Sequence, residues 1–279
     1  MSYPQEEKVP LIVVFDLDGT LVGRVHLFAA YWYSMKAMGL PVPPGFKTVV
    51  VSALRSGLVR PHIKEFMERI VTEYGVVEFF VYTASRKGWS EFLVSCIETV
   101  ASVRFNRPVF SHEEHTFRGY KSIDKIVPDI QTRLLHKYGH VPDTTIKKNA
   151  IVFDDRPHVY DHDHARDEIL TETTTATATT IIKCPKYEYF VFFDLLASLP
   201  QDALTANHER VAKIIGHVLG IKIRREFIAS RKNVEMAWAL LSQTLKSLWH
   251  EGEDRHRAST DFWMTFDTAS LRRLLPPMS

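Results

Sequence analysis

The sequence predicts an α/β fold with a parallel sheet, followed by a helical appendage toward the C-terminal end of the chain. Short runs of β-branched and aromatic residues, such as 10–15 and 150–153, are typical of strands buried on both faces. Segments with apolar residues at helical spacing lie between these runs, and strands alternating with helices indicate a parallel sheet. From Leu199 onward helical patterns dominate, which indicates a separate helical part.

The individual elements follow from the apolar pattern and from the residues that interrupt it. We expect strands at 10–15, 48–54, 79–83 and 150–153, with a shorter one at 109–110. We expect helices at 26–38, from Pro61 onward, at 89–100 and at 123–138, the last of them broken near Pro128. The Thr- and Ala-rich stretch 171–180 favours a strand or hairpin, with a mobile low-complexity insert as the alternative.

The C-terminal region carries two helical patterns, at 204–218 and at 234–248, with apolar residues three and four positions apart. We therefore divide the chain into a domain at 1–198 and a helical subdomain at 199–279, which has a normal size for a small subdomain. Trp238 and Trp249 are expected to be packing residues of these helices.

Length and charge set the broad class of the protein. The 279 residues include 35 basic and 33 acidic ones, and the net charge of +2 gives no global argument for binding nucleic acid or a membrane. No apolar run approaches the roughly 20 residues needed to span a bilayer. Cys96 and Cys184 lie in apolar segments, where buried reduced thiols are expected. We therefore expect a soluble, intracellular protein, and composition leaves its oligomeric state open.

Two aspartates one residue apart, Asp16 and Asp18, follow the first predicted strand directly. Side chains alternate along a strand, so both carboxylates point the same way, and Gly19 then allows a sharp turn into Thr20. In an α/β sheet, the carboxyl end of a strand is where ligands bind. Two carboxylates held this close repel each other unless a cation or a shared proton intervenes, so the pair favours chemistry on phosphate.

Two more predicted strands end in polar residues, which are Thr83, Ser85, Asp154 and Asp155. A parallel sheet brings its carboxyl ends to one edge, so these groups are expected to meet the first pair. The set suits phosphoryl transfer, in which one carboxylate attacks phosphorus, a second moves protons and Mg²⁺ neutralises charge. The lysine that holds phosphate oxygens comes from elsewhere, and Lys121 is the first candidate with Lys125 as the alternative.

These motifs together resemble those of the haloacid-dehalogenase superfamily, which combines the Asp-x-Asp strand end with a strand ending in Thr, a later Lys and a late Asp-Asp. Finer matches are similar to one branch, the phosphatases acting on the C-terminal domain of RNA polymerase II, also called NLI-interacting-factor-like phosphatases. These matches lie at Arg60-Pro61, Val81–Ser85, Tyr120–Ile123 and Val152–Arg156. The resemblance spans about residues 10 to 195, and Gly19 stands where this branch often has a larger polar residue.

The resemblance implies a Rossmann-like core with a small flap, and it implies a role for each matched residue. Asp16 would be the nucleophile that forms an aspartyl-phosphate, and Asp18 would be the general acid and base. The phosphoryl group would be bound by Thr83, Ser85 and Lys121. The Mg²⁺ ion would be held by Asp16, the backbone carbonyl of Asp18, and Asp155, with Asp154 supporting it.

The lengths of the segments between the motifs bear on the substrate. Neither the stretch from Asp18 to Thr83 nor the stretch from Thr83 to Lys121 holds an obvious full cap domain, so we expect an open site. An open site suits phosphoserine or phosphothreonine in a protein, unless the C-terminal helices supply a lid. The alternatives are a phosphatase for small metabolites or nucleic-acid ends, and a catalytically inactive module that binds phosphate.

Two charged clusters have no place in this site. The His- and Asp-rich stretch 158–164 fits no standard zinc spacing, so a solvated loop is favoured over a metal site. The basic residues at 224–232 are expected to form a solvated face, with docking of an acidic or phosphorylated partner as the alternative.

Overall fold

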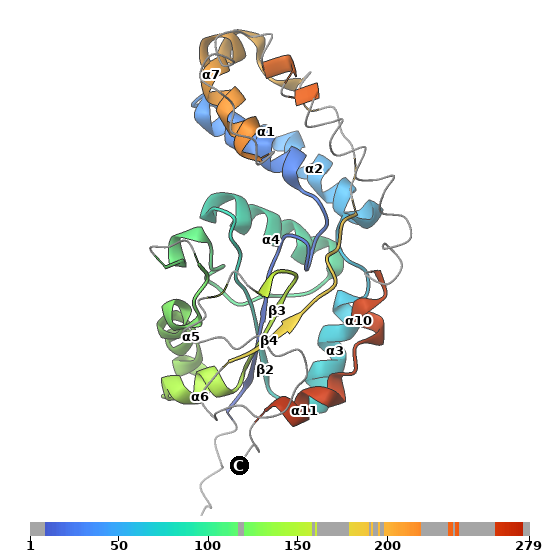
Figure 1. The fold of residues 1–279 in the computed structure, drawn as a ribbon, viewed down its shortest axis with the longest axis vertical. Helices are drawn as coiled ribbons and strands as arrows, with labels where there is room; N and C mark the ends of the chain where they lie inside the picture. Colours follow the sequence, from blue (N-terminus) through green and yellow to red (C-terminus); the bar gives the residue numbers. More distant parts are fainter. Residues whose placement is uncertain are drawn as a thin grey trace, which may run out of the picture. The chain divides into compact units, whose positions relative to one another are not determined.

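The structure is a computed structural model, and it describes residues 9–116, 120–157, 160, 179–189, 191, 195, 198–218, 234–236, 238–239 and 260–275 (Figure 1). Several predictions fall outside these residues, namely the stretch 171–178, the loop 158–164 apart from Tyr160, the basic cluster at 224–232, Trp249 and most of the helix at 234–248. None of the helices in the described part is long and apolar enough to cross a membrane.

Four parallel strands form one sheet, in the order β2, β1, β3, β4. Their bounds are Leu11–Phe15 for β1, Val77–Val81 for β2, Ala150–Asp154 for β3 and Thr180–Lys183 for β4. Phe15 lies opposite both Val81 and Phe153, so β2, β1 and β3 end level with one another. Every residue of β1 and β3 is buried, as expected of parallel strands covered on both faces.

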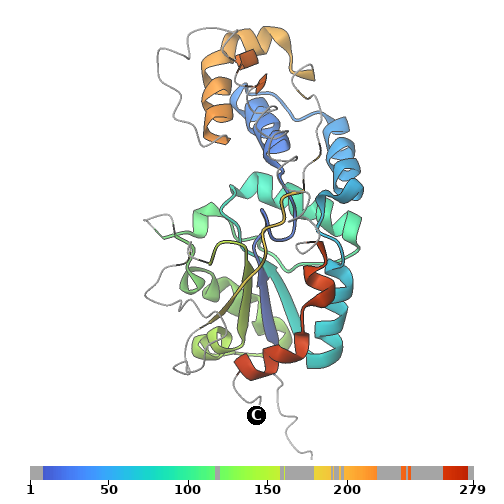
Figure 2. The ribbon, with the colours of Figure 1, turned by 45° about the vertical axis from the view of Figure 1, so that its right-hand side comes forward.

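Helices connect the strands and cover the sheet (Figure 2). The described helices are α1 His26–Ala37, α2 Pro44–Ala53, α3 Ile63–Tyr74, α4 Lys87–Ala101, α5 Ile123–Tyr138, α6 Asp143–Lys148, α7 Gln201–Val218, α10 Phe262–Thr265 and α11 Leu271–Leu274. Shorter turns are the π-helical η1 Leu54–Leu58 and the 3₁₀ turns η2 His112–Glu114 and η6 Thr268–Ser270. The predicted α/β class with a parallel sheet is confirmed.

The segment 48–54, predicted to be a strand, is instead helical and belongs to α2 and the start of η1. Pro44 takes the first position of α2, where its missing N–H does no harm. The buried side chains of this helix, Phe46, Val50 and Ala53, recur at helical spacing. Consecutive valines favour a strand locally, but burying one face of a helix outweighs that weak preference.

The predicted break at Pro128 is also wrong, because α5 runs continuously through this residue. Proline has no backbone N–H, so the hydrogen bond from position 128 to the carbonyl of Asp124 is missing near the start of the helix. Ile126, Ile130 and Leu134 are fully buried in the core beside the sheet. The burial of this face keeps the helix intact despite the missing bond.

The two faces of the sheet carry different cores. On one face the rings of Phe15 and Phe153 stack with centroids 5.6 Å apart, and Phe66 of α3 packs edge-on against both. Trp263 of α10 lies against the same rings, 5.6 Å from Phe15 and 5.3 Å from Phe153. The core that α5 and α6 help to form contains Val14 and other aliphatic residues of the strands. The aromatic core therefore depends on a segment near the C-terminal end of the chain.

The chain divides into two compact units, each made of segments far apart in the sequence. The first unit holds Met1–Leu21, Arg60–Tyr187 and Ala258–Ser279, and the second holds Val22–Val59 and Glu188–Arg257. This division differs from the predicted one at residues 198 and 199. The C-terminal segment belongs to the first unit because Trp263 is fully buried in the aromatic core there.

The second unit contains α1, α2 and α7. Helices α1 and α7 pack against each other (Figure 2), and Arg210 donates a hydrogen bond of 3.2 Å to the backbone carbonyl of Ala37. The segment after Asp18, where a small flap was predicted, is therefore combined with α7 into one unit. The open site, which was argued from the lengths of the separate segments, stays a prediction.

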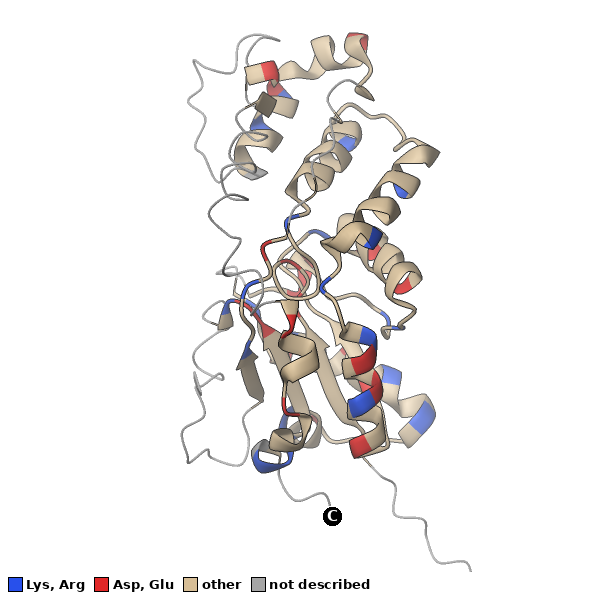
Figure 3. Cartoon of the chain, turned by 90° about the vertical axis from the view of Figure 1, so that its right-hand side faces the viewer, with Lys and Arg blue, Asp and Glu red and all other residues tan. Residues whose placement is uncertain are grey.

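Charges of both signs are interspersed on α3, where Lys64 and Glu68 form an ion pair of 3.7 Å one turn apart (Figure 3). One expectation from composition can be checked in the described part. Both cysteines, Cys96 and Cys184, are buried thiols, as predicted.

A buried glutamate ties α5 to the sheet. Glu78 of β2 is 4% exposed and accepts hydrogen bonds from Lys137 Nζ at 2.7 Å and from the Tyr138 hydroxyl at 2.6 Å. Its other oxygen accepts from Asn106 Nδ2 at 2.6 Å. Burial alone would raise the pKa of Glu78, but these hydrogen bonds outweigh it and lower the pKa below the ordinary 4.5.

We expect Glu78→Gln to lower the free energy of unfolding by about 1–3 kcal/mol at neutral pH, because three bonds to a buried charge are lost or weakened. Since the folded pKa is depressed, this contribution is complete above pH 4.5 and disappears as the pH falls below it. Urea unfolding between neutral and acidic pH measures the difference. Glu68→Gln, on the exposed side of α3, is the control. A difference that persists unchanged at the acid end would contradict the assignment.

Candidate active site

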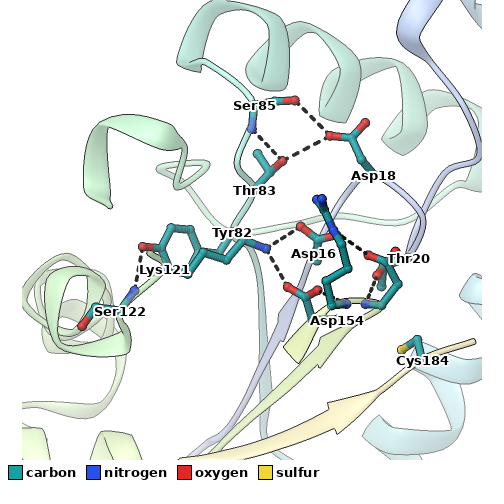
Figure 4. A network of polar contacts seen from close by, with 12 residues as sticks. Asp16, Asp18, Thr20, Tyr82, Thr83, Ser85, Lys121, Ser122, Asp154 and Cys184 are labelled. Atoms are coloured by element: carbon teal, nitrogen blue, oxygen red, sulfur yellow. Dashed lines mark hydrogen bonds and ion pairs between the residues drawn. The ribbon is translucent and has the colours of Figure 1, made fainter. Parts of the chain in front are cut away.

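The carboxyl edge of the sheet brings together polar residues from three strands (Figure 4). Asp16 directly follows β1, Asp154 is the last residue of β3, and Thr83 lies two residues beyond β2. Backbone hydrogen bonds hold these ends level, since Asp16 N donates to Phe153 O at 2.8 Å and Tyr82 N to Phe15 O at 2.9 Å. The juxtaposition expected from the sequence is therefore present.

Lys121 lies at the centre of this edge. Its Nζ donates to Asp16 Oδ1 at 2.5 Å and to Asp154 Oδ2 at 2.7 Å, and each of the three side chains is at most 2% exposed. The rings of Tyr82 and Tyr160 flank the ammonium, with centroids 5.7 and 5.5 Å away. Lys125, the alternative lysine, is exposed on α5. Lys121 is thus an internal counter-charge for two carboxylates.

The protonation of this cluster is set by burial against ion pairing. Burial raises the pKa of Asp16 to about 8, although the ammonium of Lys121 acts in the opposite direction. Burial alone would lower the pKa of Lys121, but Asp16 and Asp154 more than offset it and raise the pKa. Lys121 therefore stays protonated, and without it the carboxyl of Asp16 would be still harder to ionise.

Asp18 is held by hydroxyl groups from the segment after β2. Ser85 Oγ donates to Asp18 Oδ2 at 2.9 Å, and Thr83 Oγ1 lies 3.5 Å from the same oxygen. The backbone N–H of Ser85 in turn donates to Thr83 Oγ1 at 3.1 Å. These bonds fix the orientation of a carboxyl that is only partly buried, which suits a group that exchanges protons.

The turn after β1 packs directly against Asp155. The backbone N–H of Asp155 donates to Thr20 Oγ1 at 3.0 Å. Gly19 has a φ of +85°, and a Cβ at this position would lie 2.8 Å from Asp155 Oδ2. A larger residue at 19 would therefore have to displace the carboxylate, and the turn needs glycine for its conformation as well. Burial raises the pKa of Asp155.

A divalent cation that prefers oxygen ligands fits this edge of the sheet. Asp16, Asp154 and Asp155 each offer a carboxylate oxygen, and the three atoms lie within 4.8 Å of one another. Asp16 Oδ2 and both carboxylate oxygens of Asp155 are buried and accept no hydrogen bond from the described residues, and the ion pair of Asp155 Oδ1 with Arg156 Nε is long, at 3.8 Å. Buried carboxylates in this state need a cation or a proton, and Mg²⁺ takes such oxygens. The side chain of Asp18 lies outside this triad and is bonded to Ser85 instead.

Three kinds of residue at the site were not singled out for it from the sequence. Thr20 stands beside the Asp-x-Asp motif, so its position was a usable signal, but its bond to the Asp155 backbone was not foreseeable. Tyr82 lies inside a matched motif and Tyr160 in the His- and Asp-rich stretch, but their placement around Lys121 depends on the fold. Arg60 belongs to a motif of the resemblance, but nothing local indicates that its guanidinium is completely buried.

Comparisons with known proteins bear on the identity of this site. The family model described as NLI interacting factor-like phosphatase matches residues 11–171, which is more than half of the chain and includes the residues from Asp16 to Asp155. The search of curated proteins found no match.

Two solved structures show distant similarity. One is a variant of the fission yeast RNA polymerase II CTD phosphatase Fcp1 bound to beryllium fluoride, with 17% identity, a TM-score of 0.37, and coverage of 96% of this chain and 70% of that chain. The other is a structure of Fcp1, titled an essential RNA polymerase II CTD phosphatase, with 18% identity, a TM-score of 0.36, and coverage of 90% of this chain and 66% of that chain.

Proposed function

This chain belongs to the NLI interacting factor-like phosphatase family, and we propose that it removes phosphate from phosphoserine or phosphothreonine in a protein, through an aspartyl-phosphate on Asp16. The observation that carries the proposal is the bridge of Lys121 between Asp16 and Asp154 beside the hydroxyl-bound Asp18. The carboxyl groups of Asp16 and Asp18 thus have different environments, since Asp16 is buried and ion-paired whereas Asp18 is partly buried and hydrogen-bonded. Groups separated in this way can serve as nucleophile and as acid and base.

The reaction proceeds in two displacements at phosphorus. A carboxylate oxygen of Asp16 attacks phosphorus and the bond to the leaving oxygen breaks, while Asp18 donates the proton that this oxygen needs. Asp18, now a carboxylate, takes a proton from water, and the resulting hydroxide attacks phosphorus and releases phosphate from Asp16. Lys121 favours the ionised form of Asp16 between turnovers, since an opposite charge acts against the burial that raises the pKa of this carboxyl.

Asp16, the backbone carbonyl of Asp18, and Asp155 would hold the Mg²⁺ ion with Asp154 supporting it, and the ion would supply positive charge for the phosphate oxygens. The buried oxygens of Asp155 that accept no hydrogen bond among the described residues support this assignment. Thr83, Ser85 and Lys121 remain the proposed ligands of the phosphoryl group, and the two hydroxyls reach it by exchanging their bonds to Asp18.

We expect Asp155→Asn to raise the Mg²⁺ concentration for half-maximal activity by at least about tenfold, because losing a ligand costs no less than losing an outer-shell partner. In EDTA the same variant should unfold at a temperature equal to or above that of the wild type, since burial disfavours the Asp155 charge. Mg²⁺ should raise the unfolding temperature of the wild type and not that of the variant. Asp129→Asn, on the exposed side of α5, is the matched control. A variant that gains the wild-type Mg²⁺ shift would remove Asp155 from the metal site.

The substrate class is tested by initial rates on a panel with Mg²⁺ and with EDTA. The panel contains phosphoserine and phosphothreonine peptides, nucleotides, sugar phosphates and 3′-phosphorylated oligonucleotides. We expect the highest kcat/KM on the phosphoserine and phosphothreonine peptides. A preference for nucleotides, sugar phosphates or oligonucleotides would support the small-metabolite or nucleic-acid-end alternative. Binding without turnover across the panel would support the inactive module.

A further inference from the structure

Arg60 is a completely buried arginine close to the proposed active site. Its exposed fraction is 0%, which is rare for a side chain that is always charged. The residue stands where the chain re-enters the first unit, and its backbone N–H donates to the carbonyl of Leu21 at 2.9 Å. A charge buried this deeply must be held by specific partners.

Those partners include two backbone carbonyls and three aromatic rings. Nη1 of Arg60 donates to the carbonyl of Thr20 at 3.1 Å, and Nη2 donates to the carbonyl of Pro185. The rings around the guanidinium, with centroids 5.4, 5.2 and 5.6 Å away, belong to Tyr187, Phe262 and Trp263. Stacking on aromatic faces and forked donation are what distinguish arginine from lysine.

The carbonyl that Arg60 holds belongs to the turn against which Asp155 packs. The hydroxyl of Thr20 accepts a hydrogen bond from the backbone N–H of Asp155, and its carbonyl accepts one from the guanidinium of Arg60. Tyr187, one wall of the cage, donates its own N–H to the carbonyl of Gly19 at 2.7 Å. Two consecutive residues of the turn are therefore fixed from the cage side, while their other side faces the carboxylate triad.

We infer that Arg60 is a positioning residue for the metal-binding carboxylates, and that the C-terminal segment Thr260–Leu275 completes the aromatic cage that holds it. The inference rests on the proposed function, because it takes Asp155 as a metal ligand. Arg60 donates to backbone carbonyls, and it interacts electrostatically with Asp155. It acts by keeping the turn at Gly19 and Thr20 in place, and through it the Asp155 backbone.

The C-terminal part of the cage lies outside the family match, which ends at residue 171. Phe262 and Trp263 follow the second unit in the sequence and belong to the first unit. Arg69 of α3 holds this segment by donating to the carbonyl of Trp263 and, at 3.1 Å, to the carbonyl of Met264. Trp263 also fills the aromatic core beside β1 and β3. In this chain the phosphatase unit is therefore complete only with its C-terminal segment.

One single variant and one matched pair of variants test the inference. Arg60→Lys keeps the charge but loses the forked donation, and Phe262→Leu opens one wall of the cage. Phe266→Leu is the matched control for the latter, because Phe266 is a half-buried ring of the same segment that packs on Phe66 and Phe153. Mg²⁺ binding by isothermal titration, with MgCl₂ alone as the ligand, is measured together with the unfolding temperature and with kcat at saturating Mg²⁺.

We expect Arg60→Lys to weaken Mg²⁺ binding by about 10- to 100-fold and Phe262→Leu by about threefold or more, as for residues that orient metal ligands. Phe266→Leu should lower the unfolding temperature about as much as Phe262→Leu and leave Mg²⁺ affinity unchanged. The inference would be overturned if Phe262→Leu bound Mg²⁺ as tightly as the wild type, or if Phe266→Leu lost as much Mg²⁺ affinity as Phe262→Leu. If Arg60→Lys does not fold, the two phenylalanine variants decide alone. Failure of the proposed function would show differently, as a wild type that binds Mg²⁺ without hydrolysing any phosphate monoester.

Discussion

Replacing Asp16 by asparagine is expected to reduce the rate of phosphate-monoester hydrolysis by on the order of a thousandfold or more, because an amide cannot form the acyl phosphate. The fold should survive, since Asp154 remains as a partner for Lys121 and the buried edge loses one negative charge. The unfolding temperature in EDTA is therefore expected to be no lower than that of the wild type. Steady-state hydrolysis of an aryl phosphate with Mg²⁺ measures the rate.

The control for this variant is Asp129→Asn, which makes the same chemical change on the exposed side of α5 and should leave the rate unchanged. Full activity in Asp16→Asn would remove the proposed nucleophile. A lost activity that accompanies a collapsed unfolding temperature would be uninformative on chemistry, so both quantities are measured on one preparation.

Replacing Asp18 by asparagine is expected to lower steady-state turnover by about 10²- to 10⁴-fold, because the variant can neither protonate a leaving oxygen nor activate water. With an aryl phosphate the first displacement needs little acid assistance, whereas the second still needs a base. The variant should therefore release one burst of aryl alcohol equal to the enzyme concentration and then stall. Quenched-flow measurement of aryl alcohol and inorganic phosphate separates the two steps.

Ser85→Ala provides the comparison for this variant. It removes one hydrogen bond to Asp18, together with the proposed bond to the phosphoryl group that replaces it, and keeps the carboxyl. We therefore expect a loss of about 1 kcal/mol, or roughly fivefold, without a burst. If Asp18→Asn releases aryl alcohol and phosphate in step, with no burst, Asp18 does not act as the base of the second displacement.

The site could be predicted from the sequence wherever a residue stands at the end of a buried strand. Asp16, Thr83 and Asp154 were placed at one edge by the parallel topology alone, and the structure has them there. Lys121 was distinguished from Lys125 only by the motif around it, and its bridge between two carboxylates needed the packing of Tyr82 and Tyr160.

The features that could not be predicted depend on contacts between distant segments. Residues 48–54 have the composition of a strand, and only the burial of Phe46, Val50 and Ala53 on one face makes them helical. The position of Trp263 in the core beside β1 could not be predicted either, because no sequence pattern around this tryptophan indicates which core it joins. We predicted the division at residue 198 from a change in the sequence pattern. In the structure, residues 258–279 belong to the first unit because they contact it.

The proposed mechanism requires a covalent intermediate on Asp16, which mass spectrometry of the acid-quenched Asp18→Asn variant can detect. After one burst with aryl phosphate and Mg²⁺, we expect one phosphoryl group per chain, located on the peptide that contains Asp16 and removed by hydroxylamine. The same treatment of the double variant that also carries Asp16→Asn should give no adduct. A phosphoryl group on Thr83 or Ser85, or no adduct after a full burst, would rule out Asp16 as the residue that carries the phosphoryl group.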